Sequence, residues 1–188
     1  MPSGGGAIRY VTFGSASDRE SPTAADFNGD GRDDLIVTRT DSNGVMTHYA
    51  GDASSGAGIL AQPWGNSNIA PAPVLFGDFT GDSRADIAVF YGACPTNPNC
   101  DLGATWWIKE TGGANYTATK FGVPYNAQTG AGDRPNFGDY DGDGKFDIAV
   151  FRVSDSTNYT LGSAGGQLFT QFWNGVSASS PAENTPDD

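Results

Sequence analysis

The sequence has few basic residues. Its 188 residues include ten lysines and arginines against 22 aspartates and glutamates, and the formal net charge is −12. Proteins bind nucleic acid or an anionic membrane surface through clustered Lys and Arg, so we expect neither partner. No apolar run approaches the roughly 18 residues of a membrane-spanning helix, so we also expect no membrane insertion.

Histidine and cysteine are equally scarce. The single histidine, His48, cannot be combined with a nucleophile and an acid into a convincing catalytic set, so we expect no enzymatic activity. The two cysteines, Cys94 and Cys100, enclose a short polar loop far from His48 in sequence, which makes a shared metal site improbable. We predict a disulfide between them, as is typical outside the cytosol; the alternative is two free surface thiols.

What the sequence does contain is a repeat. The stretches DFNGDGRDDLIVT, DFTGDSRADIAVF and DYDGDGKFDIAVF begin at Asp26, Asp78 and Asp139. An aromatic–glycine marker precedes each stretch: Phe13-Gly14, Trp64-Gly65 and Phe121-Gly122. Each repeat also contains four short strand-like segments separated by glycine-rich turns, a pattern typical of propeller blades.

We therefore predict an all-β protein of three four-stranded antiparallel propeller-type blades. The predicted parts are an extra N-terminal strand (1–14), three blades (15–65, 66–122 and 123–175) and a flexible tail (176–188). The extra strand, in AIRYVTFG, resembles the fourth strand of a blade whose other strands are absent. Because closed propellers have four to eight blades, we expect a partial or open propeller that cannot close as a monomer.

Each acidic stretch places oxygen-bearing side chains at alternate positions of a glycine-containing turn. Counted from the first aspartate, positions 1, 3, 5 and 9 offer side-chain oxygens, and position 7 offers its backbone carbonyl while its basic side chain points to solvent. Such oxygen sets suit Ca²⁺, so we predict three calcium sites. The predicted ligands are Asp26, Asn28, Asp30, Arg32 and Asp34, then Asp78, Thr80, Asp82, Arg84 and Asp86, then Asp139, Asp141, Asp143, Lys145 and Asp147.

Other interpretations of these loops are less favoured. An EF-hand would need a glutamate at position 12 and flanking helices, whereas position 12 is Val37, Val89 or Val150 within a strand-like run. Solvated acidic turns or a catalytic carboxylate pair do not account for three copies in register. We expect the third loop, with most carboxylates, to bind tightest, and the second, where Ser83 replaces a glycine, to bind weakest.

Aromatic residues and two sequons are further candidates. Exposed rings stack on sugars, so the candidate glycan contacts are Trp64, Trp106, Trp107, Tyr116 and Trp173. The favoured alternative is that these rings are core wedges between blades. Asn115 and Asn158 head N-x-T sequons and are candidate N-glycosylation sites in or just after third strands.

The markers and the D-x-[DNT]-x-D-x-x-x-D loops followed by [IL]-[AI]-V resemble the FG-GAP or VCBS repeat family over residues 8 to 175. That family includes the calcium-binding blades of integrin α-subunits, some fungal lectins and bacterial surface proteins. The resemblance implies that each loop joins the first and second strands of a blade, and that Ca²⁺ rigidifies this turn.

The resemblance favours a non-enzymatic, calcium-stabilised module, extracellular or at the cell surface, that serves adhesion or recognition of a glycan or protein ligand. An alternative is a structural subunit of an extracellular fibre or surface layer, built from further copies of the chain by strand addition. An accessory fragment of a polysaccharide-degrading enzyme is less favoured, because no catalytic constellation supports it.

Overall fold

The computed structural model describes residues 10–20, 24–68, 73–92, 104–125 and 132–172. All regular elements within these ranges are strands; no helix occurs there, and hence none that could span a membrane. The strands are β1 (Arg19–Glu20), β2 (Leu35–Thr40), β3 (Val45–Gly51), β4 (Gly58–Asn66), β5 (Val74–Gly77), β6 (Asp86–Tyr91), β7 (Thr105–Lys109), β8 (Tyr116–Lys120), β9 (Asp133–Gly138), β10 (Asp147–Arg152), β11 (Thr157–Leu161) and β12 (Leu168–Phe172).

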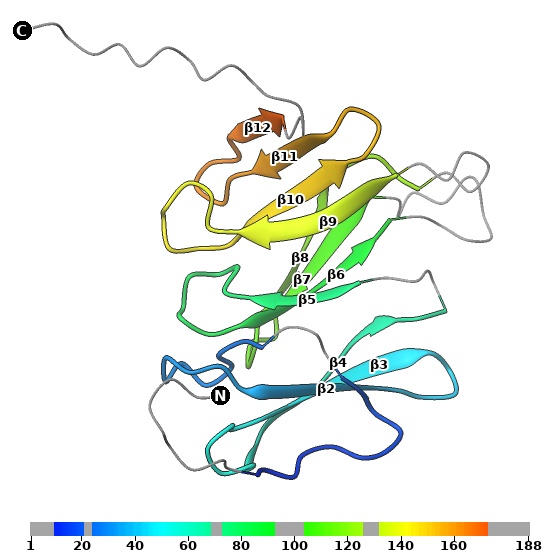
Figure 1. The fold of residues 1–188 in the computed structure, drawn as a ribbon, viewed down its shortest axis with the longest axis vertical. Coiled ribbons are helices and arrows are strands. Elements are labelled where there is room, and N and C mark those ends of the chain that lie inside the picture. The colour runs from blue at the N-terminus through cyan, green and yellow to red at the C-terminus, as the bar shows by residue number, and fades with distance from the viewer. Residues whose placement is uncertain (1–9, 21–23, 69–72, 93–103, 126–131, 173–188) are drawn as a thin grey trace, which may run out of the picture.

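The strands form three four-stranded antiparallel sheets, each made of consecutive strands in sequence order. We call these sheets blade 1 (β1–β4), blade 2 (β5–β8) and blade 3 (β9–β12). They stack face to face with blade 2 in the middle, and they do not close into a ring (Figure 1). The predicted all-β class with open, propeller-type blades is confirmed.

The turns form where the sequence favours them. Between β2 and β3, the Asp41 carboxylate accepts the backbone N–H groups of Asn43 and Val45, at 2.8 and 2.9 Å. Gly44 has a φ of 81°, which a glycine adopts without steric cost. The local sequence therefore sets this hairpin and the register of the two strands.

The first of the four strand-like segments of blade 1 does not form one continuous strand beside β2. Glu20 pairs with Val37, whereas the isolated bridge joins Ala25 to Asp34. From the first pair to the second, the chain moves five residues along the β1 side but only three along the β2 side. One continuous ladder therefore cannot form. A two-residue strand and a separate bridge take its place.

The extra N-terminal strand is not observed in its described part, residues 10–14. A strand needs a neighbour to satisfy its backbone groups, and this segment has no partner strand among the described residues. It lies on the face of blade 1 turned away from blade 2 (Figure 1). Residues 1–9 and the predicted tail lie outside the described residues.

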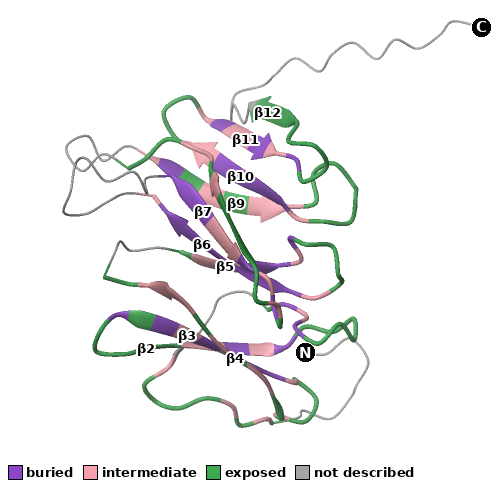
Figure 2. Cartoon of the chain, turned by 180° about the vertical axis from the view of Figure 1, so that it is seen from behind, coloured by how far each residue is buried: buried purple, intermediate pink, exposed green. Residues whose placement is uncertain are grey.

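The core lies between the blades. One cluster joins Phe27 and Ile36 of the blade 1 region to Phe76 and Ile87 of blade 2. A second cluster joins blade 2 to blade 3. Every residue of β6 is buried, since it is covered on both faces, whereas residues 168–171 of β12 are exposed (Figure 2). Blade stacking therefore supplies most of the apolar burial.

Candidate functional site

The three acidic loops share one backbone geometry. The first aspartate accepts the backbone N–H groups of positions 4 and 6 on its two oxygens, as in Asp139, with Gly142 at 2.7 Å and Gly144 at 3.1 Å. Asp26 and Asp78 make the same pair of bonds. Each loop is thus folded tightly around its first carboxylate.

The last carboxylate of each loop is buried. Asp34, Asp86 and Asp147 are at most 4% exposed. Each accepts the backbone N–H of position 2, as in Asp147 from Tyr140 at 2.8 Å. The second oxygen of Asp147 accepts the N–H of Ser163 at 2.6 Å. A buried carboxylate at the base of the loop therefore faces the more exposed ones above it.

The third loop brings carboxylates together. Single oxygens of Asp139, Asp141 and Asp147 all lie within 4.8 Å of one another. Two full charges at that separation repel by roughly 1 to 3 kcal/mol at effective dielectric constants between those of water and a protein surface. The ion pairs Arg39–Asp18 and Arg152–Asp133 do not involve these three groups. The donor set therefore fits a hard cation such as Ca²⁺, which prefers carboxylate oxygens.

The other two loops fit less completely. Thr80 and Asn28 replace an aspartate at position 3, so fewer charges converge there. At position 6 the second loop holds Ser83 at a φ of 66°, where the other loops have glycine. The hydroxyl of Thr111 has no hydrogen-bond partner among the described residues, although its backbone N–H binds Asp86 at 3.0 Å. A buried, unsatisfied oxygen thus lies beside the base of the second loop.

Burial raises the pKa of two loop carboxyls. Desolvation is the main cause for both Asp34 and Asp86. The nearby carboxylates of Asp26 and Asp30 add to the shift for Asp34. In contrast, the backbone N–H of Lys145 and the hydroxyl of Ser163 lower the pKa of Asp143. A bound cation would favour the ionised form of all these groups.

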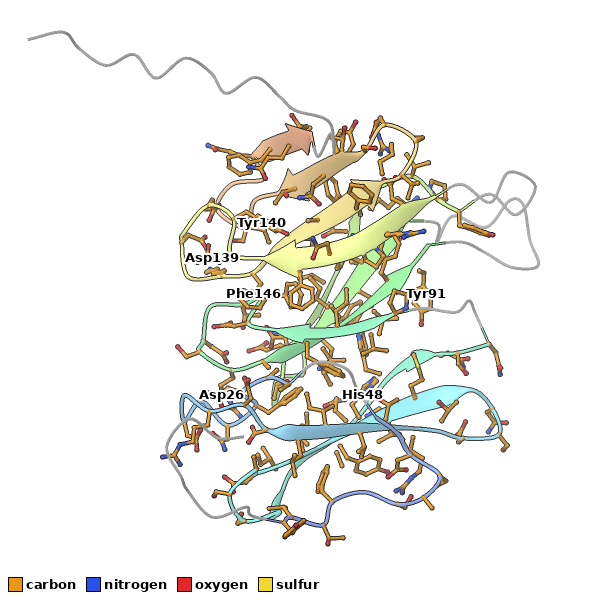
Figure 3. The ribbon with its side chains drawn as sticks, viewed as in Figure 1. Asp26, His48, Tyr91, Asp139, Tyr140 and Phe146 are labelled. Atoms are coloured by element: carbon orange, nitrogen blue, oxygen red, sulfur yellow. The ribbon has the colours of Figure 1, made fainter. Side chains whose placement is uncertain are left out.

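The loops also contact one another across the blades. The backbone N–H of Ala85 donates to the carbonyl of Asp26 at 2.6 Å, and that of Phe146 donates to the carbonyl of Asp78 at 2.7 Å. Position 8 of one loop therefore always binds position 1 of the loop before it. Asp26 and Asp139 lie along the same edge of the stack (Figure 3).

The sequence led us to expect that the basic side chains at position 7 point to solvent. In the structure, two of them lie over a neighbouring loop instead. The side chain of Arg84 lies over Gly29 of the first loop, and its Nε donates to the carbonyl of Phe27 at 3.3 Å. Lys145 lies over Gly81 in the same way. The first and second acidic loops are thereby each covered by a cation from the following blade, which lowers repulsion between neighbouring loops.

The aromatic–glycine markers form the joints between blades. A Cβ on Gly65 would lie 3.0 Å from Val89 of the next blade, and a Cβ on Gly122 would lie 3.2 Å from Val150. Gly65 has a φ of 88° and Gly122 a φ of 121°, values that other residues rarely adopt. Glycine is required because the backbone crosses the face of the next blade.

A clamp beside the marker was not predicted. The Asp133 carboxylate accepts both the backbone N–H of Val123, at 2.7 Å, and a bidentate pair from Arg152 at 2.8 and 2.9 Å. The Arg152 guanidinium lies 4.2 Å from the ring centre of Tyr159. An alignment of the repeats would have indicated a shared role for this arginine, because Arg39 and Arg152 occupy equivalent positions in blades 1 and 3.

The candidate glycan contacts divide into buried and exposed rings. Trp106 is fully buried in the cluster between blades 2 and 3, so it is a core wedge and not available to a ligand. Tyr116 is 56% exposed and stacks on Trp107 with ring centres 5.7 Å apart. It also lies 5.5 Å from the Trp64 ring. Trp173 lies outside the described residues.

The sequons differ in accessibility. Asn115 is exposed directly before β8. Asn158 lies within β11 and its amide donates to the Thr160 hydroxyl at 3.2 Å. The structure does not describe Cys94 and Cys100, so the disulfide stays a prediction.

Comparison with known proteins gives one match. No curated protein and no solved structure matches the chain significantly. Residues 26–89 match the family model of an FG-GAP-like repeat, which runs from the first acidic loop through the blade 1–blade 2 joint to Val89. Blade 3 lies outside the match but repeats the same loop and joint. The match supports the assignment of this part of the chain to the FG-GAP repeat family.

Proposed function

We propose that the chain is a non-enzymatic repeat module, extracellular or at the cell surface, whose loops bind Ca²⁺ and whose surface recognises a glycan or protein. The observation that carries the proposal is the convergence of Asp139, Asp141 and Asp147. The similarity of residues 26–89 to an FG-GAP-like repeat agrees with a propeller-type module.

In this proposal the cations stabilise the stacked blades and do not catalyse a reaction. The first and second loops are each hydrogen-bonded to the following loop through their first carbonyl, so ordering one loop also orders the joint to its neighbour. The single histidine supports a non-enzymatic role. His48 is 1% exposed, and its ring nitrogens are engaged by the Thr38 hydroxyl and the Trp64 carbonyl.

Calorimetric titration with calcium and thermal unfolding with calcium or a chelator test the metal. Three binding events are expected. A site at a hundredfold excess over its Kd contributes about 2.7 kcal/mol to stability. Asp30→Asn should weaken one event, whereas Asp33→Asn removes an equal charge from an exposed non-ligand position of the same loop and should leave the binding count unchanged. Unchanged unfolding with and without calcium would refute the metal proposal.

The ligand surface is proposed at the joint of blades 1 and 2. Tyr116, Trp64 and Trp107 form a contiguous aromatic cluster with one exposed ring. Exposed aromatic faces suit the apolar faces of sugar rings and also serve as protein anchors.

Glycan-array and pull-down binding of two variants test this surface. Tyr116→Ala should abolish binding, and Tyr125→Ala, which removes another exposed tyrosine outside the cluster, should not. Equal binding by the wild type and both variants would place the ligand elsewhere.

A further inference from the structure

The two joints between blades follow one pattern. In each, a ring N–H from the third strand donates to the carbonyl of the marker aromatic residue of the same blade. His48 Nε2 lies 2.8 Å from the Trp64 carbonyl, and Trp106 Nε1 lies 3.3 Å from the Phe121 carbonyl. These rings fill the space between neighbouring blades.

The residue after each marker glycine is also held in the same way. The N–H of Asn66 donates to the Tyr91 hydroxyl at 3.0 Å in the first joint. The N–H of Val123 donates to Asp133 at 2.7 Å in the second. Each acceptor belongs to the following blade, so this bond ties consecutive blades together.

The outer face of blade 1 carries a third copy of this joint. Asp18 accepts the N–H of Ser15 at 2.8 Å and a bidentate pair from Arg39 at 2.7 and 3.0 Å. Arg39 lies 4.8 Å from the ring centre of Tyr49. Arg39 also lowers the pKa of Asp18 to about 2. Every group matches the clamp of the blade 2–blade 3 joint.

The marker glycine of this third joint, Gly14, also lies against blade 1. Gly14 has a φ of 86°, and a Cβ there would lie 3.2 Å from Val37. Val37 holds the position that Val89 and Val150 hold in the other two joints. Residues 13–15 therefore lie where the end of a preceding blade's fourth strand would lie.

One part of this third joint is open. A hollow of about 350 Å³ lies beside Phe13 and is lined by Tyr49 and Ala61, among others. In the blade 2–blade 3 joint, the corresponding Phe121 and Tyr159 pack in one cluster with Trp106. The hollow is thus the place of a third-strand ring from a preceding blade.

The acidic loop of blade 1 also carries a positive charge, on Arg32, that a preceding blade could use. Arg32 is exposed at the position from which Arg84 and Lys145 cover the loop of the blade before them. A preceding blade would place its acidic loop under Arg32. Its first loop carbonyl would meet the backbone N–H of Asp33, as in the other two joints.

We propose that the outer face of blade 1 docks a further three-stranded sheet of the same repeat type, which none of the three described blades supplies, with residues 10–14 as its fourth strand. The partner sheet carries a Trp or His on its third strand, which fills the hollow and donates to the Phe13 carbonyl. It also carries an acidic loop that meets Arg32. This docking requires neither bound calcium nor the recognition role proposed above.

A second copy of this chain does not fit as the partner. The outward face of blade 3 holds Asn136, Tyr140 and Thr160 where blade 2 holds Leu75, Phe79 and Ile108. Asn136 and Tyr140 are exposed, and the Asn136 amide donates to the Tyr140 hydroxyl at 3.1 Å. Thr160 is buried, and its hydroxyl accepts from the Asn158 amide at 3.2 Å. The fourth-strand position of blade 3 is already occupied by β12.

The test uses blade 2 as the probe, because its outward face is apolar and carries Trp106. Residues 73–115 are fused ahead of residue 8 of the full chain through a protease-cleavable linker, and the linker is then cut. The fragment should stay bound through gel filtration and raise the unfolding temperature of the chain. Release of the fragment from the wild-type chain after cutting would overturn the proposal.

Matched variants separate this docking from adhesive binding. Gly14→Val should release the fragment, whereas Gly165→Val, with a similar φ of 88° in open space, should retain it. Arg32→Glu should weaken retention roughly two- to fivefold, and Arg134→Glu on blade 3 should not. Equal retention by all four variants would overturn the assigned face.

Sedimentation of the unfused chain gives a separate readout of the partner. The chain should stay monomeric. Self-association that Gly14→Val abolishes would make a second copy the occupant, and would overturn the proposed partner. All these measurements are made with and without calcium, so failure of the metal proposal does not decide them.

Discussion

Replacing the marker glycine Gly65 by alanine is expected to destabilise the stack strongly. The residue has a φ of 88°, and a non-glycine residue in this region costs about 1 to 2 kcal/mol. The new Cβ would lie 2.5 Å from the Met46 Cε and 3.0 Å from the Val89 Cγ2. Overpacking of this kind costs typically 1 to 3 kcal/mol. Because Met46 is flexible and can move, we expect a total loss of about 2 to 4 kcal/mol.

Chemical denaturation followed by circular dichroism measures this loss. Gly58→Ala is the matched control, since Gly58 lies in the same strand without a positive φ and with open space at its Cβ. It should change the free energy of unfolding by about 0.5 kcal/mol or less. A second change, Val89→Ala, removes the rigid neighbour and should make the Gly65→Ala cost smaller than in the wild-type background. Equal destabilisation by the two glycine variants would refute the joint geometry as the reason for glycine.

Three further predictions concern the loops and the buried ring. Ser83→Gly should stabilise the chain by about 1 kcal/mol by removing a non-glycine residue from a φ of 66°; denaturation beside Ser42→Gly checks this, and no difference between them contradicts it. Asp141→Asn should lower calcium affinity more than Asp82→Asn in calorimetric titration, because the third loop holds the convergent carboxylates found in the described residues. A larger loss for Asp82→Asn would contradict the prediction that the third loop binds calcium more tightly than the second. Burial lowers the pKa of His48 below its ordinary value of 6.5, so the unfolded state takes up a proton first, and stability is full above pH 6.5 and falls as the pH drops below it. His48→Gln should flatten this dependence in denaturation series at neutral and mildly acidic pH, and an unchanged slope would assign it to other groups.

Most strands could be predicted because their signals are local. The acidic loop ends in a run such as DIAVF, and β6 and β10 begin at its last aspartate, Asp86 and Asp147. Glycine and asparagine mark the turns that separate the strands. The first strand of blade 1 was not predictable in this way, because its break depends on how many residues its partner offers.

The site was predictable in part. The spacing of the carboxylates indicated which oxygens belong together, and the third loop brings three of them within 4.8 Å. The spacing did not reveal that Arg84 and Lys145 cover the neighbouring loops, because their targets lie a whole blade away in sequence. The Asp18–Arg39 clamp was missed for the same reason, since its partners are joined only by the fold.

The sequence by itself determined the repeat, the strand segments and the oxygen-rich turns, because each depends on residues close together along the chain. Only the tertiary structure decided which face of each blade meets the next. It showed that Gly65 and Gly122 are points of contact between sheets, that Gly14 lies against Val37 of blade 1, and that Trp106 belongs to the core. These properties arise from stacking sheets whose contacting residues are far apart in sequence, so spacing along one repeat could not reveal them.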